Sequence, residues 1–308
     1  MMEVKMTDAA IKINNVHKYY GKVHALRGLD LEVNRGEVFG FLGPNGAGKT
    51  TTIRCMLDLI RPNHGSINVF GVNPQQYPQA VKGMVGYLPG DLKLEGDFTA
   101  RDFLLYVRKL RQGERPWKDI TDLADRLNLE MDKKIKTLSQ GNKQKVGFIQ
   151  CFLSNTPLLL LDEPTLGLDP LIKQEVLNIV REQREKGVTI FFSSHILSEV
   201  QKVADRVGII RKGKLVEIAQ TDDLINRALT RATVQFAQEV PESEFGSLTN
   251  VSVLRVNDDG RSYTLEIEGE MDGFIKALAD HTVRDIGIHR PSLEEVFLKY
   301  YRDEEEEA

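Results

Sequence analysis

One glycine-rich stretch has the residue types that bind phosphate. Residues 43–50 read GPNGAGKT and match the pattern G-x-x-x-x-G-K-[ST]. In this pattern backbone N–H groups wrap phosphate oxygens, the lysine neutralises the β- and γ-phosphate charges, and the last hydroxyl ligates Mg²⁺. A purely structural glycine turn is the alternative, but the stretch lies between a strand pattern and a helix pattern, as phosphate binding requires. The predicted nucleotide-binding residues are Gly43, Pro44, Asn45, Gly46, Ala47, Gly48, Lys49, Thr50 and Thr51.

Two adjacent carboxylates follow the four leucines of residues 158–161. A phosphate-binding loop that uses Mg²⁺ needs a carboxylate at the end of a neighbouring buried strand, and Asp162 has that position. We expect Asp162 and Thr50 to hold the metal, and Glu163 to orient or deprotonate the attacking water. An Asp at a strand end also serves as a turn cap, and this is the alternative for Asp162 taken alone.

A histidine and a helix start complete the candidate chemistry. His195 ends the apolar run VTIFFSSH, and ligands of open α/β sheets bind at the carboxyl ends of strands. We expect His195 to donate a hydrogen bond to a γ-phosphate oxygen, the alternative being a structural histidine. Residues 138–145 read LSQGNKQK and open a helix-patterned run, so their free N–H groups favour an anion. We expect Lys143 and Lys145 to be surface positions rather than ligands.

The surrounding patterns predict how these residues are positioned. Residues 11–14 and 29–33 alternate apolar and polar, as half-buried strands do. The continuous apolar runs before Asp162 and His195 fit strands buried on both faces of a parallel sheet, and the amphipathic run 174–187 between them completes a βαβ crossover.

A helical insert is predicted at about residues 95–155, and its first helix is opened by a capping box of Thr99 and Asp102. After a predicted hairpin with its turn at residues 212–213, the sequence pattern changes. Residues 226–301 read as a small α+β domain with a hairpin turn at residues 259–260 and a last helix opened by Ser292 and Glu295.

The chain termini and the overall composition limit the possible domain bounds, partners and compartment. Residues 1–9 are predicted to be flexible, 10–225 to form the main domain, and the acidic residues 302–308 to be a solvated tail. A net charge of −4 gives no basic excess to attract nucleic acid, so none is predicted as a partner. Two distant cysteines, Cys55 and Cys151, indicate a reducing compartment. The N-terminus lacks a signal-peptide core, and no apolar run is long enough to span a bilayer.

These motifs, in this order, resemble the ATP-binding cassette (ABC) family. The phosphate loop is followed by the signature LSQGN, by LLLLDEP, by a D-loop containing Asp169, and by the switch residue His195; the match covers roughly residues 10–225. The resemblance implies an α/β P-loop NTPase cassette with a mixed sheet and a helical insert, and ATP with Mg²⁺ as cofactors. It also implies that Tyr20 stacks on adenine, the alternative being a simple strand-end aromatic next to Tyr19.

In this family two cassettes pair head to tail, and each ATP lies between one phosphate loop and the other subunit's signature. The resemblance therefore implies a homodimer in which the signature acts in trans, through Leu138, Ser139, Gln140, Gly141 and Asn142. The usual signature is L-S-G-G-Q, so Gln140 and Asn142 are departures. A second departure is the loop where the family places Gln or Glu, which here reads Gly90 and Asp91.

The resemblance implies the ATPase subunit of an export system whose integral-membrane permease is a separate chain docking on the helical insert. Its expected location is the cytoplasmic face of a bacterial or archaeal membrane, as a peripheral protein. The C-terminal domain is similar to extensions of exporter cassettes, with subunit contact, regulation or passive stabilisation as its open roles. A soluble ABC ATPase without a permease is the alternative, and a metabolic P-loop kinase is a weaker one.

Overall fold

The computed structural model describes residues 9–111, 115–221, 223, 230–246, 248–257 and 259–289. The chain divides into two compact units, Met1–Ala219 and Gln220–Ala308. The predicted flexible N-terminus before residue 9, the last helix with Ser292 and Glu295, and the acidic tail lie outside the described residues. Across the described ranges, no helix is long and apolar enough to cross a membrane.

A six-stranded sheet forms the centre of the first unit. Its order is β5-β6-β7-β3-β8-β9, and neighbouring strands from β5 to β8 pair in parallel. The predicted buried strands are confirmed, because every residue of β3, β6 and β7 is buried. The strands are β3 (Val38–Leu42), β5 (Val85–Leu88), β6 (Leu158–Asp162), β7 (Thr189–Ser194), β8 (Arg206–Arg211) and β9 (Lys214–Gln220). The turn between β8 and β9 has positive φ at both Lys212 and Gly213, which fits the predicted hairpin.

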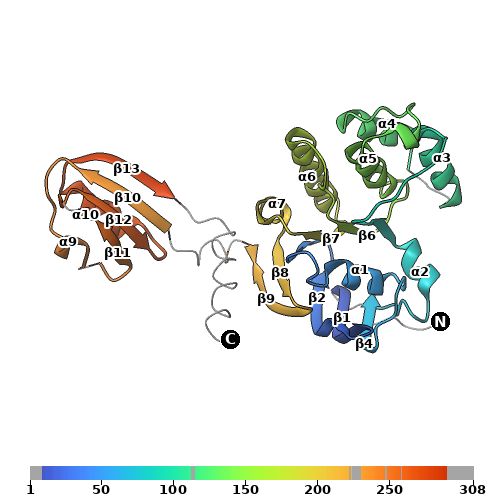
Figure 1. Ribbon diagram of the computed structural model, residues 1–308, viewed down its shortest axis with the longest axis horizontal. Coiled ribbons are helices and arrows are strands. Elements are labelled where there is room, and N and C mark those ends of the chain that lie inside the picture. Colours follow the sequence, from blue (N-terminus) through green and yellow to red (C-terminus); the bar gives the residue numbers. More distant parts are fainter. Residues whose placement is uncertain are drawn as a thin grey trace. The chain divides into compact units, whose positions relative to one another are not determined.

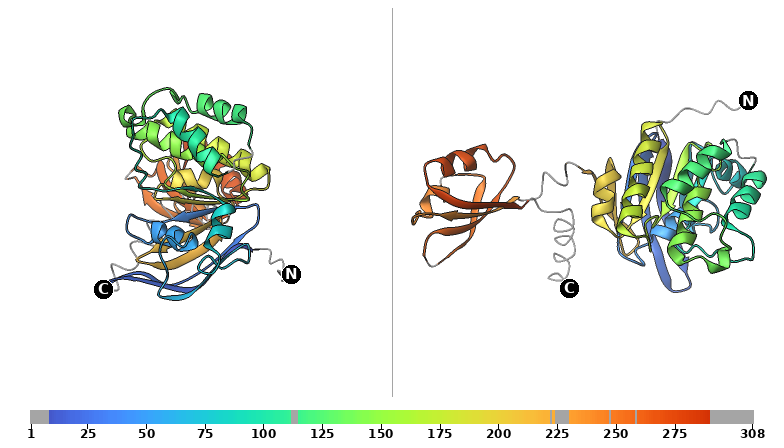
Figure 2. Two further views of the ribbon diagram at one scale, coloured as in Figure 1. Left: turned by 90° about the vertical axis from the view of Figure 1, so that its right-hand side faces the viewer. Right: turned by 90° about the horizontal axis from the view of Figure 1, so that it is seen from above.

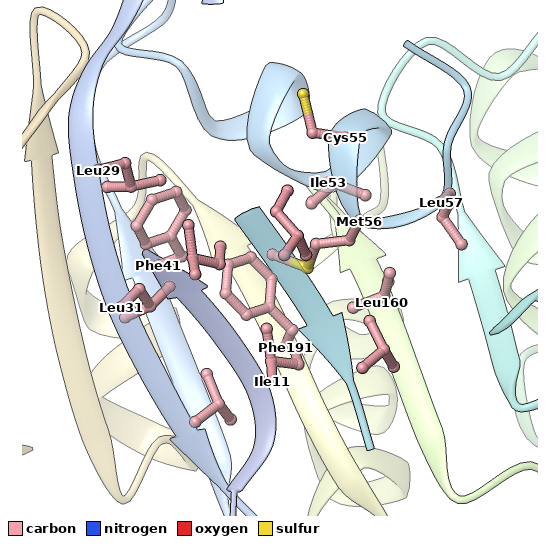
Figure 3. Close-up of a cluster of buried hydrophobic side chains, with 14 of the residues drawn as sticks. Ile11, Leu29, Leu31, Phe41, Ile53, Cys55, Met56, Leu57, Leu160 and Phe191 are labelled. Atoms are coloured by element: carbon pink, nitrogen blue, oxygen red, sulfur yellow. The ribbon is translucent and has the colours of Figure 1, made fainter. Parts of the chain in front are cut away.

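A second, antiparallel sheet of the first unit has the order β2-β1-β4. It consists of β1 (Ala9–Tyr20), β2 (Val23–Asn34) and β4 (His64–Val69), and its first two strands contain the predicted alternating segments. Helix α1 (Lys49–Met56) packs with both sheets. Figure 3 shows the side chains of Ile53 and Met56 from α1 near the rings of Phe41 and Phe191. This core fixes the strand-to-helix turn at the start of α1.

The helices of the first unit include the predicted insert. Besides α1, the described helices are α2 (Pro78–Gly83), α3 (Ala100–Leu110), α4 (Trp117–Arg126), a 3₁₀ helix (Ile135–Thr137), α5 (Gln140–Gln150), α6 (Pro170–Glu185) and α7 (Leu197–Val203). The capping box of Thr99 and Asp102 is confirmed. Within this unit α3, α4 and α5 gather at the end opposite the β1-β2-β4 sheet (Figures 1 and 2).

One arginine joins the insert to α6. Arg126, the last residue of α4, donates to Glu175 at 2.6 Å and to both carboxylate oxygens of Glu182 at 2.6 and 2.9 Å. Bidentate arginine–carboxylate pairs are strong and directional. The guanidinium lowers the pKa of Glu182. We call these three residues the Arg126 clamp.

In its described residues, the second unit is a four-stranded antiparallel sheet with the helices α9 and α10. Its strand order is β11-β12-β10-β13, and its buried side chains form their own core around Phe236, Phe245 and Tyr263. The predicted hairpin with its turn at Asp259 and Gly260 is present between β11 and β12. The elements are β10 (Thr230–Phe236), α9 (Ser243–Gly246), β11 (Val251–Val256), β12 (Ser262–Ile267), α10 (Asp272–Ala279) and β13 (Val283–His289).

Candidate nucleotide-binding site

The glycine-rich loop lies between β3 and α1 and bends tightly against its surroundings. A Cβ at Gly43 would meet the carbonyl oxygen of Ile210 at 2.3 Å, and Gly48 has a φ of 117°. Gly46, at φ 80°, has no atom within 4 Å of its Cβ position, so its backbone is open to a ligand. The loop lines a cavity of 340 Å³ together with Ala25, Arg54, Gly90, Asp91, Glu163 and Leu166. Every loop residue except Gly43 and Ala47 lines this cavity.

Lys49 holds a nearly buried ammonium at the start of α1. Its side chain is 6% exposed, and Nζ donates to the carbonyl oxygens of Gly43 at 2.6 Å and Pro44 at 3.2 Å. Nζ also lies 3.2 Å from Oε1 of Glu163. A buried cation needs such partners, because desolvation of an unpaired charge is costly. The loop therefore presents one concentrated positive charge at the cavity.

Asp162 and Thr50 meet at the end of β6. The Thr50 hydroxyl donates to Oδ2 of Asp162 at 2.7 Å, and the Ser193 hydroxyl from β7 donates to Oδ1. Both Asp162 oxygens are thereby oriented, and the residue is fully buried. A hydroxyl and a carboxylate are hard oxygen donors of the kind Mg²⁺ prefers, so this pair fits the predicted metal position.

Glu163 lies between the lysine and the histidine that the sequence singled out. Oε2 accepts a hydrogen bond from Nδ1 of His195 at 2.8 Å, while Oε1 faces Lys49. Oε1 is also buried without a hydrogen-bond partner among the described residues. The ammonium of Lys49, 3.2 Å away, compensates the charge at Oε1, and the open hydrogen-bond position of this atom can accept a water hydrogen.

The backbone of Glu163 is held in the left-handed region. Its φ is 50°, which a non-glycine residue rarely adopts. Its N–H donates to the carbonyl oxygen of Ser193 at 3.0 Å, and its own carbonyl oxygen accepts from Gln144 of α5 at 3.1 Å. Strained residues persist where their surroundings over-determine them, and they cluster at functional sites. Glu163 is therefore positioned from β7 and from α5 as well as from its own strand.

The signature residues form the start of α5, as the sequence predicts. Ser139 is the N-cap, and its hydroxyl accepts from the N–H of Asn142 at 3.3 Å. Gly141 allows a close approach, since a Cβ there would lie 2.7 Å from the carbonyl oxygen of Gly167. None of residues 138–142 lines the cavity of the glycine-rich loop. Within one chain, the start of α5 is thus separate from the cavity of the glycine-rich loop, although both are candidates for binding phosphate.

Lys145, one of the two lysines near this helix start, corrects an expectation. It is 8% exposed rather than a surface position, and Nζ donates to the carbonyl oxygen of Asn128 at 3.2 Å. Its burial lowers the pKa of the amine. The helix turns this side chain inward toward the loop after α4.

Gly90 and Asp91 line the cavity but differ in their surroundings. A Cβ at Gly90 would lie 3.0 Å from Oδ2 of Asp162, so any larger residue there would press on the carboxylate. The Asp91 side chain is 69% exposed and lies 3.6 Å from Nζ of Lys93. This loop therefore brings backbone, rather than a side chain, against Asp162.

The remaining predicted residues lie at element ends. The Tyr20 ring is 45% exposed, with Nζ of Lys18 5.3 Å from its centroid, and its adenine-stacking role stays a prediction. Tyr19 instead stacks on His24, with centroids 4.0 Å apart. Asp169 is the N-cap of α6, where its carboxylate accepts from the N–H of Ile172 at 3.1 Å.

Sequence reasoning missed a buried carboxylate behind the site. Glu199 of α7 is 6% exposed and accepts from Ser194 at 3.4 Å and from Lys173 at 3.2 Å. It also accepts from Thr165, two residues after Glu163. The segments that carry Glu163 and His195 are thereby tied together. The sequence gives only a weak signal for Glu199, which is an acidic residue at a position where a short helix would be expected to carry an apolar one.

Comparison with known proteins gives the family of this site. Residues 26–166 match the profile of a family described as "ABC transporter". A second profile, described as "AAA domain, putative AbiEii toxin, Type IV TA system", matches residues 134–200. The bacitracin transport ATP-binding protein BcrA of Bacillus licheniformis is 33% identical over 299 residues, which cover 94% of this chain and 96% of the relative.

Another relative and a solved structure agree with this. The daunorubicin resistance ATP-binding protein DrrA3 of Streptomyces coeruleorubidus is 32% identical, over 97% of this chain and 98% of its own length. A solved structure described as an ATP-binding subunit of an ABC transporter superposes with a TM-score of 0.64 at 29% identity, over 70% of this chain and 91% of that one. The predicted P-loop cassette fold is thus confirmed, and the chain belongs to the ABC transporter family as one of its ATP-binding proteins.

Proposed function

We propose that this chain hydrolyses ATP through the residues assembled at the ends of β3, β6 and β7. The carrying observation is the placement of the Glu163 carboxylate between Lys49 and His195, at the edge of the glycine-lined cavity. The glycine-rich loop supplies N–H donors for the phosphates, and Lys49 exchanges its carbonyl partners for phosphate oxygens. Thr50 and Asp162 would hold Mg²⁺, which neutralises phosphate charge when bound.

The hydrolytic step assigns one role to each remaining side chain. Glu163 accepts a proton from water as the water oxygen bonds to the γ-phosphorus, and the bond to the bridging oxygen breaks to release ADP and phosphate. His195 donates to Glu163 through Nδ1, which fixes the carboxylate, and in the imidazolium form, with both ring nitrogens protonated, it also donates to the γ-phosphate through Nε2. Ser193 holds Asp162 in its rotamer. Glu199 holds the two catalytic segments together, as a positioning residue.

We further propose that two copies share each site. The start of α5 has the free N–H groups and the positive dipole end of an anion site, yet it does not line the cavity of its own chain. A head-to-tail pair of chains would bring Ser139 and Gly141 of one copy to the γ-phosphate on the other. The anion that this helix start is built to receive would then come from a second copy.

Mixing two inactive variants tests the shared site. Ser139→Arg and Lys49→Ala should each be inactive alone. Mixed in equal amounts they should recover about a quarter of wild-type turnover, because half of random dimers are mixed and each carries one intact site. Two preparations of the same variant, mixed in the same way, are the control. A mixture as inactive as its components would place Ser139 and Lys49 in one chain's site, or make each site depend on the other.

We propose that this ATPase cycle powers export through a separately encoded integral-membrane permease, with this chain as a peripheral subunit on the cytoplasmic face. In support, relatives that align over both units carry names for bacitracin transport and daunorubicin resistance. No helix in the described part of the chain could provide the membrane path itself. Exposed apolar residues on α3, among them Leu105, Tyr106 and Leu110, offer a docking surface on the helical insert.

A pull-down from detergent-solubilised native membranes tests the partner. Tagged Glu163→Gln protein with ATP should retain a polytopic membrane protein at near-equal stoichiometry, and the same protein without ATP is the comparison. Recovery of soluble partners only, with the chain absent from the membrane fraction, would favour the soluble ABC ATPase over the exporter.

A further inference from the structure

A second cavity lies at the opposite ends of β6 and β7 from the nucleotide-binding residues. Its volume is 390 Å³, and its walls come from the segment before α4, from the linker between α5 and β6, and from the end of α6. We call it the linker cavity. Its lining residues include Arg115, Phe152, Ser154, Thr156, Gln183 and Lys186.

The linker cavity is positively charged. Arg115 and Lys186 line it, and none of its described lining residues is acidic. Outside the cavity, Asp119 acts electrostatically on Arg115, and Lys186 helps to lower the pKa of Glu182, but neither cation forms an ion pair with a carboxylate among the described residues. The Arg115 guanidinium lies over the Phe152 ring at 5.7 Å and donates through Nε to Asn155 at 3.5 Å. Its terminal NH₂ groups have no acceptor in the described part of the chain, so the two-pronged face that binds oxyanions is available.

Two hydroxyls from residues that line the same cavity lack a partner in the described part of the chain. Ser154 Oγ and Thr156 Oγ1 are buried and make no hydrogen bond to any described residue, and Thr156 is only 7% exposed. Buried hydroxyls without partners are uncommon, and a bound ion or water usually accounts for them. Both residues line the linker cavity, and both also line a neighbouring cavity beside α2. Gln183, 4% exposed, adds an amide to the same wall.

We propose that the linker cavity binds a phosphate group, either as free phosphate or as part of a small organic phosphate. Arg115 and Lys186 supply the countercharge, and the Ser154 and Thr156 hydroxyls supply neutral donors. The volume exceeds that of a phosphate ion, and Phe152, Leu159 and Val188 give an apolar wall for an organic part. The site is separate from the ATP cavity, because the two share no lining residue.

Two elements, α5 and β6, connect the linker cavity to residues of the proposed ATP site. Helix α5 is capped at its start by the signature residue Ser139 and ends at the linker, and β6 begins at the linker and ends at Asp162. A ligand bridging Arg115, the linker and Lys186 therefore touches the far ends of two elements that carry site residues.

Calorimetric titration of the full chain tests the proposal. Inorganic phosphate and glycerol 3-phosphate are titrated separately at constant ionic strength, with saturating MgADP, and glycerol is the blank. We expect binding that weakens about 10- to 100-fold in the Arg115→Gln/Lys186→Gln double variant, because charged hydrogen bonds are lost. Tighter binding of glycerol 3-phosphate than of phosphate would indicate an organic ligand, and equal binding would indicate free phosphate. The matched control is Lys118→Gln, whose side chain is 81% exposed and paired with Asp122.

Two further variants distinguish phosphate binding in the linker cavity from binding at the ATP loop and from a purely structural role of Thr156. Lys49→Ala should still bind phosphate. If instead Lys49→Ala lost phosphate binding while the Arg115→Gln/Lys186→Gln double variant kept it, the phosphate would be bound at the ATP loop and not in the linker cavity. That outcome would overturn the linker site and leave the proposed ATPase intact. Thr156→Val should weaken phosphate binding without lowering the thermal midpoint of the free protein, because it removes an unpartnered hydroxyl. A lower midpoint with unchanged binding would make Thr156 structural and contradict its role as a ligand.

Discussion

Glu163→Gln is expected to bind ATP, to hydrolyse it about 10²- to 10⁴-fold more slowly than wild type, and to dimerise when ATP is added. The amide keeps the shape of the side chain, and its oxygen can still accept from His195 at the Oε2 position. It cannot take a proton from water, so the step that releases phosphate stalls. ATP then stays between two copies, and the closed dimer becomes the dominant species.

Phosphate release and light scattering with saturating ATP measure the two effects together. Glu130→Gln is the matched control, because the same change is made at a side chain that is 59% exposed and paired with Lys133. We expect that control to hydrolyse ATP at the wild-type rate and to remain monomeric as ATP is consumed. Glu163→Gln turning over at the control rate would remove Glu163 as the base. A monomer at saturating ATP would remove the main support for the shared site.

Lys49→Ala should lose both ATP affinity and hydrolysis. The ammonium is nearly buried and is the charge that the glycine-rich loop directs at the cavity, so its removal leaves the phosphates without a compensating cation. A hydrogen bond to a charged group contributes about 1.5–3 kcal/mol, which predicts affinity reduced by about 10- to 100-fold. Hydrolysis should fall further, because the lysine also stabilises the charge that develops in the transition state.

Titration with a fluorescent ATP analogue and a phosphate-release assay measure these losses. The control is Lys93→Ala, which removes a lysine 78% exposed beside the same cavity rim, 3.6 Å from Asp91. If Lys93→Ala reduced affinity as much as Lys49→Ala, the effect would be general electrostatic attraction rather than a specific contact. Near-normal turnover in purified Lys49→Ala would remove the assignment of the glycine-rich loop.

The parts of the site that sequence predicted share a physical basis. The glycine-rich loop, Asp162, Glu163 and His195 each follow an apolar run, and parallel strands bring their carboxyl ends to one edge of a sheet. Run length and spacing along the chain are therefore enough to place these residues together. The structure brings Thr50 to Asp162, the two residues expected to share a metal, and it adds contacts from Lys49 to Glu163 and from Glu163 to His195 that the sequence did not predict.

Other features depend on contacts that no local pattern records. Ser193 orients Asp162 only because β7 pairs with β6 in one register, in which Asp162 lies opposite Ser193. Lys145 is buried because the loop after α4 offers a carbonyl oxygen, 17 residues away in sequence. The crowding of Gly90 against Asp162 likewise needs the folded backbone. The domain boundaries and the roles of the site residues stay predictions.

The Arg126 clamp has a consequence for how the cassette responds to its surroundings. It joins the helix α4 to α6 through charges that are partly exposed, with the arginine side chain 35% exposed and Glu182 40% exposed. Exposed charge pairs weaken as salt rises, whereas apolar packing does not. Ionic strength therefore tunes the stiffness of this joint separately from the stability of the core, and the same protein is more compliant in concentrated than in dilute salt.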